Sequence, residues 1–190
     1  MIVKRKEETI KMNNGTHLHV FTEVVPKEEL MQEMEIAEKA YENNPCLIKK
    51  LGYLYAKGDY LFGSGDAKEA IEYLEDELDM IHDLDNAPET LLKWLDVNSL
   101  MAEMLIREKK LDKAMKYADV VIECAENHFP GTVEYIYAEE LYATVLALNN
   151  ETKIAKRWYN DALDGVKGEM AGIEKLRRNI ETSLAELNEK

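Results

Sequence analysis

The chain has 190 residues, 46% of them hydrophobic and 33% charged, which are proportions of a folded protein and not of a disordered one. Only four prolines and nine glycines interrupt a composition rich in helix-forming residues, so we expect a mainly α-helical fold. The formal net charge of −14 disfavours direct nucleic-acid binding, and no apolar run approaches the ~18 residues of a membrane span.

The negative charge is concentrated in the middle of the sequence. Residues 61–105 contain twelve acidic side chains but only two basic ones. This segment would steer a basic partner protein toward it, although a solvated helical surface is the simpler interpretation. The stretch 75–85, EDELDMIHDLD, would alternatively imitate a nucleic-acid backbone and inhibit a DNA-binding enzyme.

The two cysteines give no sign of a metal site. Cys46 and Cys124 lack a metal-binding spacing and lie in apolar helical stretches, so we expect reduced, buried thiols. The N-terminal residues have no apolar run of signal-peptide length. We therefore expect a cytoplasmic protein.

Residues 9–21, TIKMNNGTHLHVF, differ from the rest by alternating β-formers around Asn14-Gly15. This dipeptide is a strong hairpin signal because both residues tolerate positive φ. We expect residues 1–25 to form a β-hairpin extension that lies on the helices or pairs with another chain. With Asn14-Gly15 as the loop, Ile10 lies opposite His19. One face of the hairpin then carries Ile10, Met12, His17, His19 and Phe21.

His17 and His19 are two residues apart on a predicted strand, a spacing that suits two ligands of a zinc ion. The sequence offers no further ligand nearby, and half-buried structural histidines are the other interpretation. A metal-dependent enzyme that uses this pair is one alternative function.

Apolar residues at helical spacing predict the first two helices. One begins near Glu28 and stops at Asn43-Asn44-Pro45, because the residue before a proline avoids the helical region. The second covers Cys46–Lys57. Its inward-facing residues are expected to be Leu47, Leu51, Leu54 and Tyr55. The glycine-rich residues 58–66 that follow are interpreted as an inserted loop.

Further helices are expected along the rest of the chain, and residues 26–190 should form one helical domain. The expected helices cover residues 67–84, 89–107, 111–127, a pair within 138–163, and an amphipathic capping helix within 168–187.

Small residues recur where the paired helices must touch. Ala143 and Ala155 are twelve residues apart, and Ala102 and Ala114 repeat this spacing. The alanines of the second helices, beginning with Ala70, are 44 and 41 residues apart.

This pattern resembles tetratricopeptide (TPR) repeats over residues 27–165. The resemblance rests on three sets of residues: Leu51-Gly52 with Tyr55, Ala70-Ile71 and Leu74; Met101-Ala102 with Leu105, Ala114 and Ala118; and Tyr142-Ala143 with Leu146, Ala155, Tyr159 and Ala162. It implies a right-handed array of antiparallel helix pairs that docks proteins or peptides. The repeats are longer than the usual ~34 residues, so longer helices or linkers must absorb the difference. A plain antiparallel helical array of the same topology is the alternative.

In such an array, a second stripe of each first helix would line a concave binding surface. Counted from Gly52, Ala102 and Ala143, the predicted stripe consists of Lys49, Tyr53 and Lys57, of Ser99, Glu103 and Arg107, and of Glu140, Thr144 and Leu148. The mixed charge of this stripe suits an extended peptide or a partner helix.

The leading functional hypothesis is therefore a non-catalytic scaffold or adaptor that binds a protein or peptide partner, and a basic partner is one candidate. No nucleophile and base are paired by spacing, and we expect no catalytic site, metal or cofactor. The hairpin edge and the last helix are candidate contacts for a homodimer.

Overall fold

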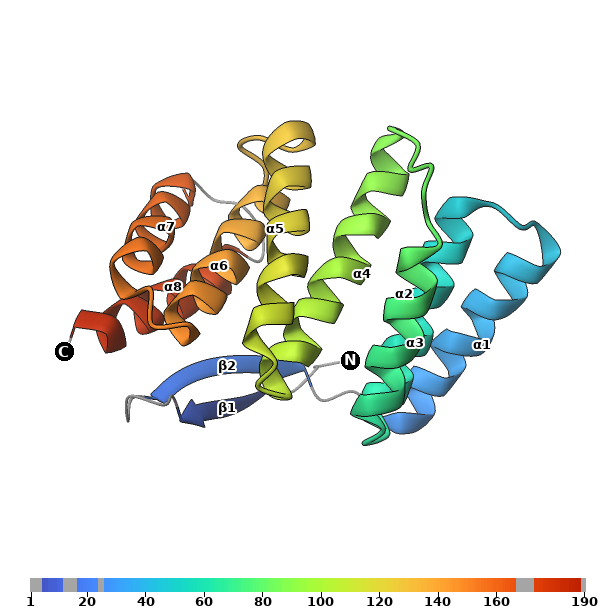
Figure 1. Cartoon of the computed structure of the whole chain (residues 1–190), viewed down its shortest axis with the longest axis horizontal. Coiled ribbons are helices and arrows are strands. Elements are labelled where there is room, and N and C mark those ends of the chain that lie inside the picture. Colours follow the sequence, from blue (N-terminus) through green and yellow to red (C-terminus); the bar gives the residue numbers. More distant parts are fainter. Residues whose placement is uncertain (1–4, 12–16, 24–25, 167–172, 189–190) are drawn as a thin grey trace. The chain divides into compact units, whose positions relative to one another are not determined.

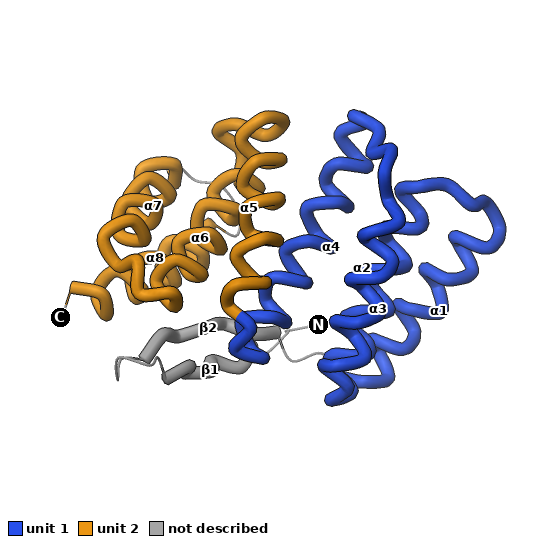
Figure 2. Tube along the Cα trace, in the orientation of Figure 1, with its two compact units in different colours: residues 1–4, 24–110 blue, residues 5–23, 111–190 orange. Residues whose placement is uncertain are grey.

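A computed structural model describes residues 5–11, 17–23, 26–166 and 173–188 of the chain. Within these ranges the fold is mainly α-helical, with eight helices and two strands (Figure 1). The chain divides into two compact units, one built from residues 24–110 and the other from residues 5–23 and 111–190 (Figure 2). This division is finer than the predicted single helical domain and leaves that prediction open.

Unit 1 contains four helices, and three of them pack against the fourth. They are α1 (Lys27–Asn43), α2 (Leu47–Gly63), α3 (Ala67–Asp79) and α4 (Pro88–Arg107). Helix α2 packs against each of the other three, and α3 also contacts α4. Figure 1 shows α2 and α4 beginning at the same end of the unit, with α3 running in the opposite direction. The helical repeat therefore places two first helices, α2 and α4, next to each other.

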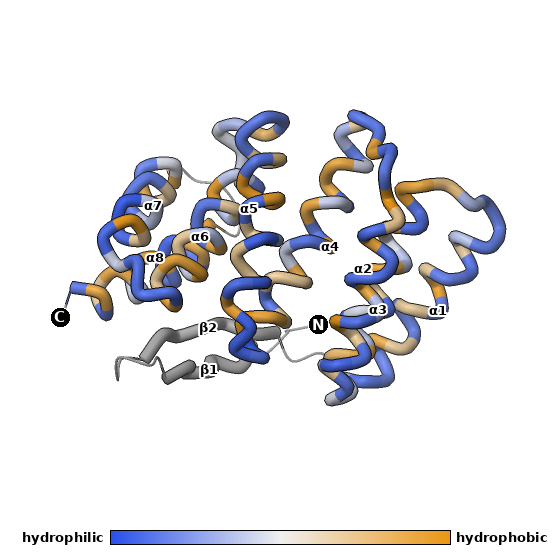
Figure 3. Tube along the Cα trace, viewed as in Figure 1, coloured by the Kyte–Doolittle hydropathy of each residue, from blue (hydrophilic) through white to orange (hydrophobic). Residues whose placement is uncertain are grey.

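Unit 2 contains α5 (Leu111–His128), α6 (Val133–Leu148), α7 (Thr152–Gly165) and α8 (Ile173–Asn188). Helix α6 contacts the other three helices, and the consecutive residues 143–148 in its second half are all buried. The other helices are amphipathic, and Figure 3 shows hydrophobic and hydrophilic residues alternating along α7. An amphipathic helix buries only one stripe of its surface. Because α6 buries residues on more than one face, it is the central helix of this unit.

Two antiparallel strands, β1 (Arg5–Lys11) and β2 (His17–Glu23), occupy the region of the predicted hairpin. The predicted register is wrong by one residue. The Cα partner of His19 is Thr9 and that of Leu18 is Ile10. The predicted pairing of Ile10 with His19 is therefore wrong. Strand β2 lies against α8, while the expected loop at Asn14-Gly15 falls outside the described residues.

Three helix pairs are joined by turns of the same length and backbone geometry. The turns are residues 64–66, 108–110 and 149–151, and the middle residue of each is left-handed: φ is 92° at Gly65, 57° at Lys109 and 66° at Asn150. In each turn, the third residue donates its N–H to a carbonyl five residues earlier, as in Asp66 to Leu61. This bond and the left-handed residue satisfy the free carbonyls of the preceding helix.

The predicted loop over residues 58–66 is therefore wrong for most of its length, because α2 continues to Gly63 and only a three-residue turn follows. The predicted helix over residues 67–84 is also too long. Helix α3 ends at Asp79, and residues 81–87 form an irregular connection that leads to the beginning of α4. Ile81, expected on the helical stripe, lies in this connection.

The common turn also corrects the alignment of the repeats. The residue seven positions before the left-handed residue is Gly58 in the first pair, Ala102 in the second and Ala143 in the third. Gly58 is buried, and a Cβ added there would lie 2.7 Å from Cδ1 of Leu74, whereas one added to Gly52 would meet nothing within 4 Å. Gly58, and not Gly52, is the small residue that lets α2 and α3 approach closely.

The alanines predicted to lie between helices are buried. Ala143 and Ala155 belong to the hydrophobic core of unit 2, together with Tyr159 and Ala162. Ala102 and Ala114 are also fully buried, but they lie in different units. Small buried residues at these positions confirm the predicted packing in the α6–α7 pair.

Candidate protein-binding surface

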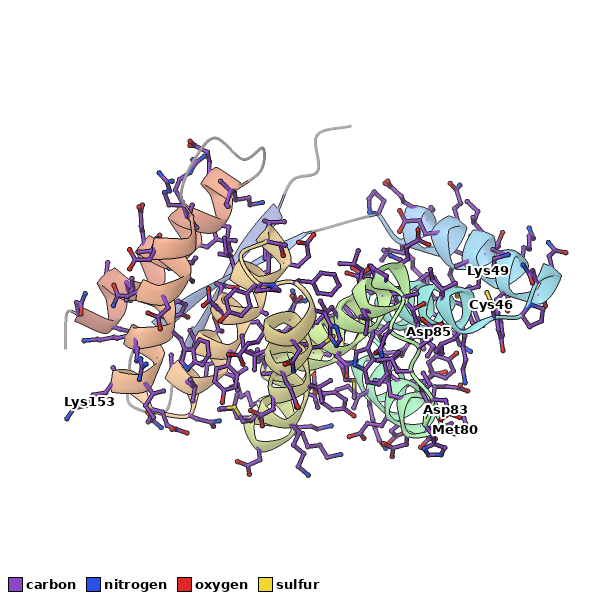
Figure 4. The ribbon with its side chains drawn as sticks, turned by 90° about the horizontal axis from the view of Figure 1, so that it is seen from above. Cys46, Lys49, Met80, Asp83, Asp85 and Lys153 are labelled. Atoms are coloured by element: carbon purple, nitrogen blue, oxygen red, sulfur yellow. The ribbon has the colours of Figure 1, made fainter. Side chains whose placement is uncertain are left out.

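Two of the three predicted binding residues of α2 are engaged with neighbouring helices. The Tyr53 hydroxyl donates a hydrogen bond to Oε1 of Glu38 at 3.2 Å, and its ring stacks on Tyr41 with the centroids 6.3 Å apart. The ammonium of Lys57 lies 4.0 Å from the ring centroid of Tyr73 and 5.6 Å from that of Tyr53. Tyr53 and Lys57 thus connect α2 to α1 and α3. Lys49 lies near the beginning of α2, close to Cys46 (Figure 4).

The predicted residues of α4 have different environments. Glu103 is exposed and Ser99 is half-buried. The guanidinium of Arg107 lies 4.9 Å from the ring centroid of Phe62 and so links the end of α4 to α2. Ser99 and Glu103 therefore remain on an accessible face of unit 1, while Arg107 serves packing between helices.

The predicted residues of α6 belong to unit 2, and two of them are in its interior. Thr144 is 7% exposed, and its hydroxyl lies 2.9 Å from that of the fully buried Tyr159. Leu148 is buried as well, and Glu140 is half-buried, with Oε1 3.5 Å from Thr144 Oγ1. Thr144 and Leu148 are core residues because α6 is surrounded on all sides.

The corrected alignment identifies the residues of α2 that match those of α4. Tyr55 and Ser99 both lie ten residues before the left-handed residue of their turns, and Asp59 and Glu103 both lie six residues before it. Since α2 and α4 pack side by side, these positions belong to neighbouring helices of one unit. The predicted inward position of Tyr55 is wrong, because 37% of its surface is exposed.

Four carboxylates lie within electrostatic reach of the Tyr55 hydroxyl. Burial raises the pKa of Tyr55, and the negative charges of Asp59, Glu103, Asp96 and Glu33 raise it further. These acids come from α1, α2 and α4. We call these five residues, Glu33, Tyr55, Asp59, Asp96 and Glu103, the Tyr55 surface. Lys93 Nζ lies 2.9 Å from Oδ2 of Asp96 and offsets part of the charge.

The other candidate sites gain no support from the described part of the chain. No group of three His, Cys, Asp or Glu side chains that could hold a metal occurs there. The side chains of His17 and His19 fall outside that description, so the metal hypothesis stays a prediction. Cys46 is exposed and Cys124 half-buried, so the expectation of a buried thiol is wrong for Cys46.

The acidic stretch 75–85 does not form one helical surface. Its first part forms the end of α3, which stops at Asp79, and the remainder belongs to the irregular connection to α4. Met80 and Asp83 are exposed near the end of α3 (Figure 4). The hypothesis of a nucleic-acid mimic stays a prediction. Among the described helices, none has the length and apolar character needed to cross a membrane.

The comparisons with known proteins bear on the fold alone. No family model and no curated protein matches the sequence. A crystal structure of BtubC (BKLC) from P. vanneervenii superposes with a TM-score of 0.65 at 16% identity, covering 86% of this chain and 64% of that one. The chain thus spans less than two thirds of the length of BtubC.

A crystal structure of a TPR-like protein from Chlorobium tepidum TLS has a TM-score of 0.48 at 15% identity, over 85% of this chain and 98% of that one. The prediction of a mainly α-helical fold built from helix pairs is confirmed, and these pairs are joined by a common turn.

Proposed function

We propose that the chain is a non-catalytic interaction module whose Tyr55 surface binds a positively charged, extended segment of a partner protein. The observation that carries this proposal is the matched placement of Tyr55 and Asp59 on α2 with Ser99 and Glu103 on α4. Helical repeats commonly bind partners through equivalent positions on successive helices, because stacking aligns these positions into one surface. An extended segment can then contact several of them at once.

The charge of the surface selects the partner's chemistry. Four acids raise the pKa of Tyr55, and residues 61–105, which include Asp96 and Glu103, contain twelve acidic side chains but only two basic ones, so the local charge is negative. Like charges placed together across an interface cost free energy, whereas opposite charges speed association and fix the orientation. A basic segment is therefore favoured over an acidic one.

Selection of peptides from a random phage-displayed library against the immobilised chain tests the proposal. We expect the selected peptides to be enriched in lysine and arginine. They should lose binding when Asp59→Lys and Glu103→Lys are combined. The matched control combines Glu69→Lys and Asp76→Lys, two exposed acids of α3, and should retain binding. Peptides without basic enrichment, or equal binding to both charge-reversed variants, would contradict the proposal.

A further inference from the structure

Unit 1 repeatedly places its own cations over its aromatic rings. Lys57 lies over Tyr73 and Tyr53, and Lys27 lies 5.6 Å from the ring centroid of Tyr60. Arg107 lies over Phe62 in the same way. A cation over an aromatic face is attracted by the negative charge of the ring face, and this attraction strengthens when water is partly excluded. The chain therefore already uses this contact at four rings of α2 and α3.

Tyr55 differs from these four rings. No lysine or arginine of the described residues lies over its ring, although it is on the same helix as Tyr53, Tyr60 and Phe62. Among the large hydrophobic residues of unit 1, Tyr55 is also an aromatic side chain with a large exposed fraction, 37%. The negative charges of acids from three helices, α1, α2 and α4, act on its hydroxyl. The ring face and the nearby charges thus attract the same kind of ligand.

We infer that Tyr55 receives a lysine or arginine side chain of the partner segment, and that the negative charges of Asp59 on α2 and Glu103 on α4 attract this side chain. This inference rests on the proposed function and names the residue that recognises the partner. Asp59 follows Tyr55 by four positions, so the two side chains share one face of α2. The cation can therefore contact the ring while its charge is balanced by a carboxylate one turn away.

The alternative roles of Tyr55 predict different partners. A purely apolar contact would bury the ring under an aliphatic side chain and bring the four carboxylates against low-dielectric surface, which is costly. A contact through the hydroxyl alone would need the oxygen and not the ring. These alternatives are separated by two substitutions, since Tyr55→Phe keeps the ring without the hydroxyl and Tyr55→Leu keeps an apolar side chain without the ring.

The test is an NMR titration of the full chain with a peptide of twelve alternating lysine and serine residues. A peptide with glutamate in place of lysine is the matched control. We expect the lysine peptide to shift the amides of α2 and α4 and the glutamate peptide to leave them unchanged. Tyr55→Leu should weaken the lysine peptide about two- to fivefold, as expected for one exposed cation–aromatic contact, while Tyr55→Phe should bind like the unmodified chain. The dispersion of the amide spectrum verifies that each variant is folded.

Tyr137 provides the control for the loss of an exposed ring, because it is 45% exposed on α6 in unit 2. Tyr137→Leu should not alter the affinity. If the lysine peptide shifts α2 and α4 but Tyr55→Leu binds it with unchanged affinity, the role of Tyr55 is refuted while the proposed function survives. If neither peptide perturbs α2 and α4, the proposed function itself is refuted.

Discussion

Two glycines of α2, six residues apart, have opposite environments and make a matched experiment. Gly58 faces the fully buried Leu74, whereas Gly52 faces open space. We expect Gly52→Ala to raise the free energy of unfolding by about 0.5–1 kcal/mol, because alanine restricts the unfolded chain and favours the helix. Gly58→Ala should lower it by about 1–3 kcal/mol, since Leu74 cannot move into solvent. Urea denaturation of both variants measures the difference, and equal effects would show that the repeat alignment is wrong.

Glu139 is the buried acid of unit 2 whose ionisation opposes folding. Only 4% of its surface is exposed, and burial raises its pKa from the ordinary 4.5 to about 7. A hydrogen bond from Tyr135 lowers the pKa and the charge of Asp161 raises it, but burial has the largest effect. Between pH 4.5 and 7 the folded state retains a proton that the unfolded state has released, so stability falls as the pH rises through this window.

We therefore expect Glu139→Gln to be more stable than the unmodified chain at pH 8, by about 1–2 kcal/mol, and to have lost most of this advantage at pH 5. A glutamine avoids the cost of a buried negative charge at the higher pH. Urea denaturation at both pH values measures the effect. The control is Glu123→Gln on the exposed side of α5, for which the two pH values should give the same small difference.

At the scale of the elements, the three helix pairs share a common turn. Its left-handed position is occupied by a different residue in each pair, namely Gly65, Lys109 and Asn150. Glycine adopts positive φ without cost, whereas a lysine there is strained by about 1 kcal/mol and an asparagine by less. We expect Lys109→Gly to stabilise the chain by up to about 1 kcal/mol and Asn150→Gly by a smaller amount. Gly65→Ala should destabilise it by about 1 kcal/mol. Thermal denaturation ranks the three variants, and Lys110→Gly, next to the left-handed position, is the control that should not stabilise.

The α6–α7 pair also contains a buried polar contact. The hydroxyls of Tyr159 and Thr144 are 2.9 Å apart in the core. Tyr159→Phe should cost about 1–2 kcal/mol, because it leaves the buried Thr144 hydroxyl with a weaker set of partners. Adding Thr144→Val should cost less than the sum of the two single changes, since both remove the same contact. Additive losses in urea denaturation would show that the two hydroxyls are not coupled.

At the scale of the whole molecule, the division into two compact units predicts that substitutions in different units change the free energy of unfolding independently. Gly58 and Tyr159 lie in different units and share no described contact. We expect the losses caused by Gly58→Ala and Tyr159→Phe to add in the double variant to within about 0.5 kcal/mol. Hydrogen exchange should show reduced protection in α2 and α3 for the first change and in α6 and α7 for the second. A strongly non-additive double variant would indicate a single cooperative core.

The sequence predicted the class of fold and the packing alanines, but its repeat alignment of α2 was wrong. The spacings of 44 and 41 residues between Ala70, Ala114 and Ala155 apply equally to the first helices and lead from Ala102 back to Gly58. Counting from Gly52 instead of Gly58 displaced the predicted binding stripe to Lys49, Tyr53 and Lys57. The same spacing would have identified Tyr55 and Asp59 as the equivalents of Ser99 and Glu103.

The sequence by itself determined that the chain forms amphipathic helices in pairs. The reason is that hydrophobic periodicity and the positions of small residues are local properties, visible within a short stretch of sequence. It could not determine which face of each helix meets a neighbour. Tyr53, Tyr55 and Lys57 are all compatible with an exposed position on α2, and only the packing of α1, α3 and α4 decided which of them is covered. Likewise, the sequence predicts Thr144 on the surface, but it is buried because α6 packs against α5, α7 and α8. Burial depends on which elements are adjacent in space, and this adjacency exists only in the tertiary structure.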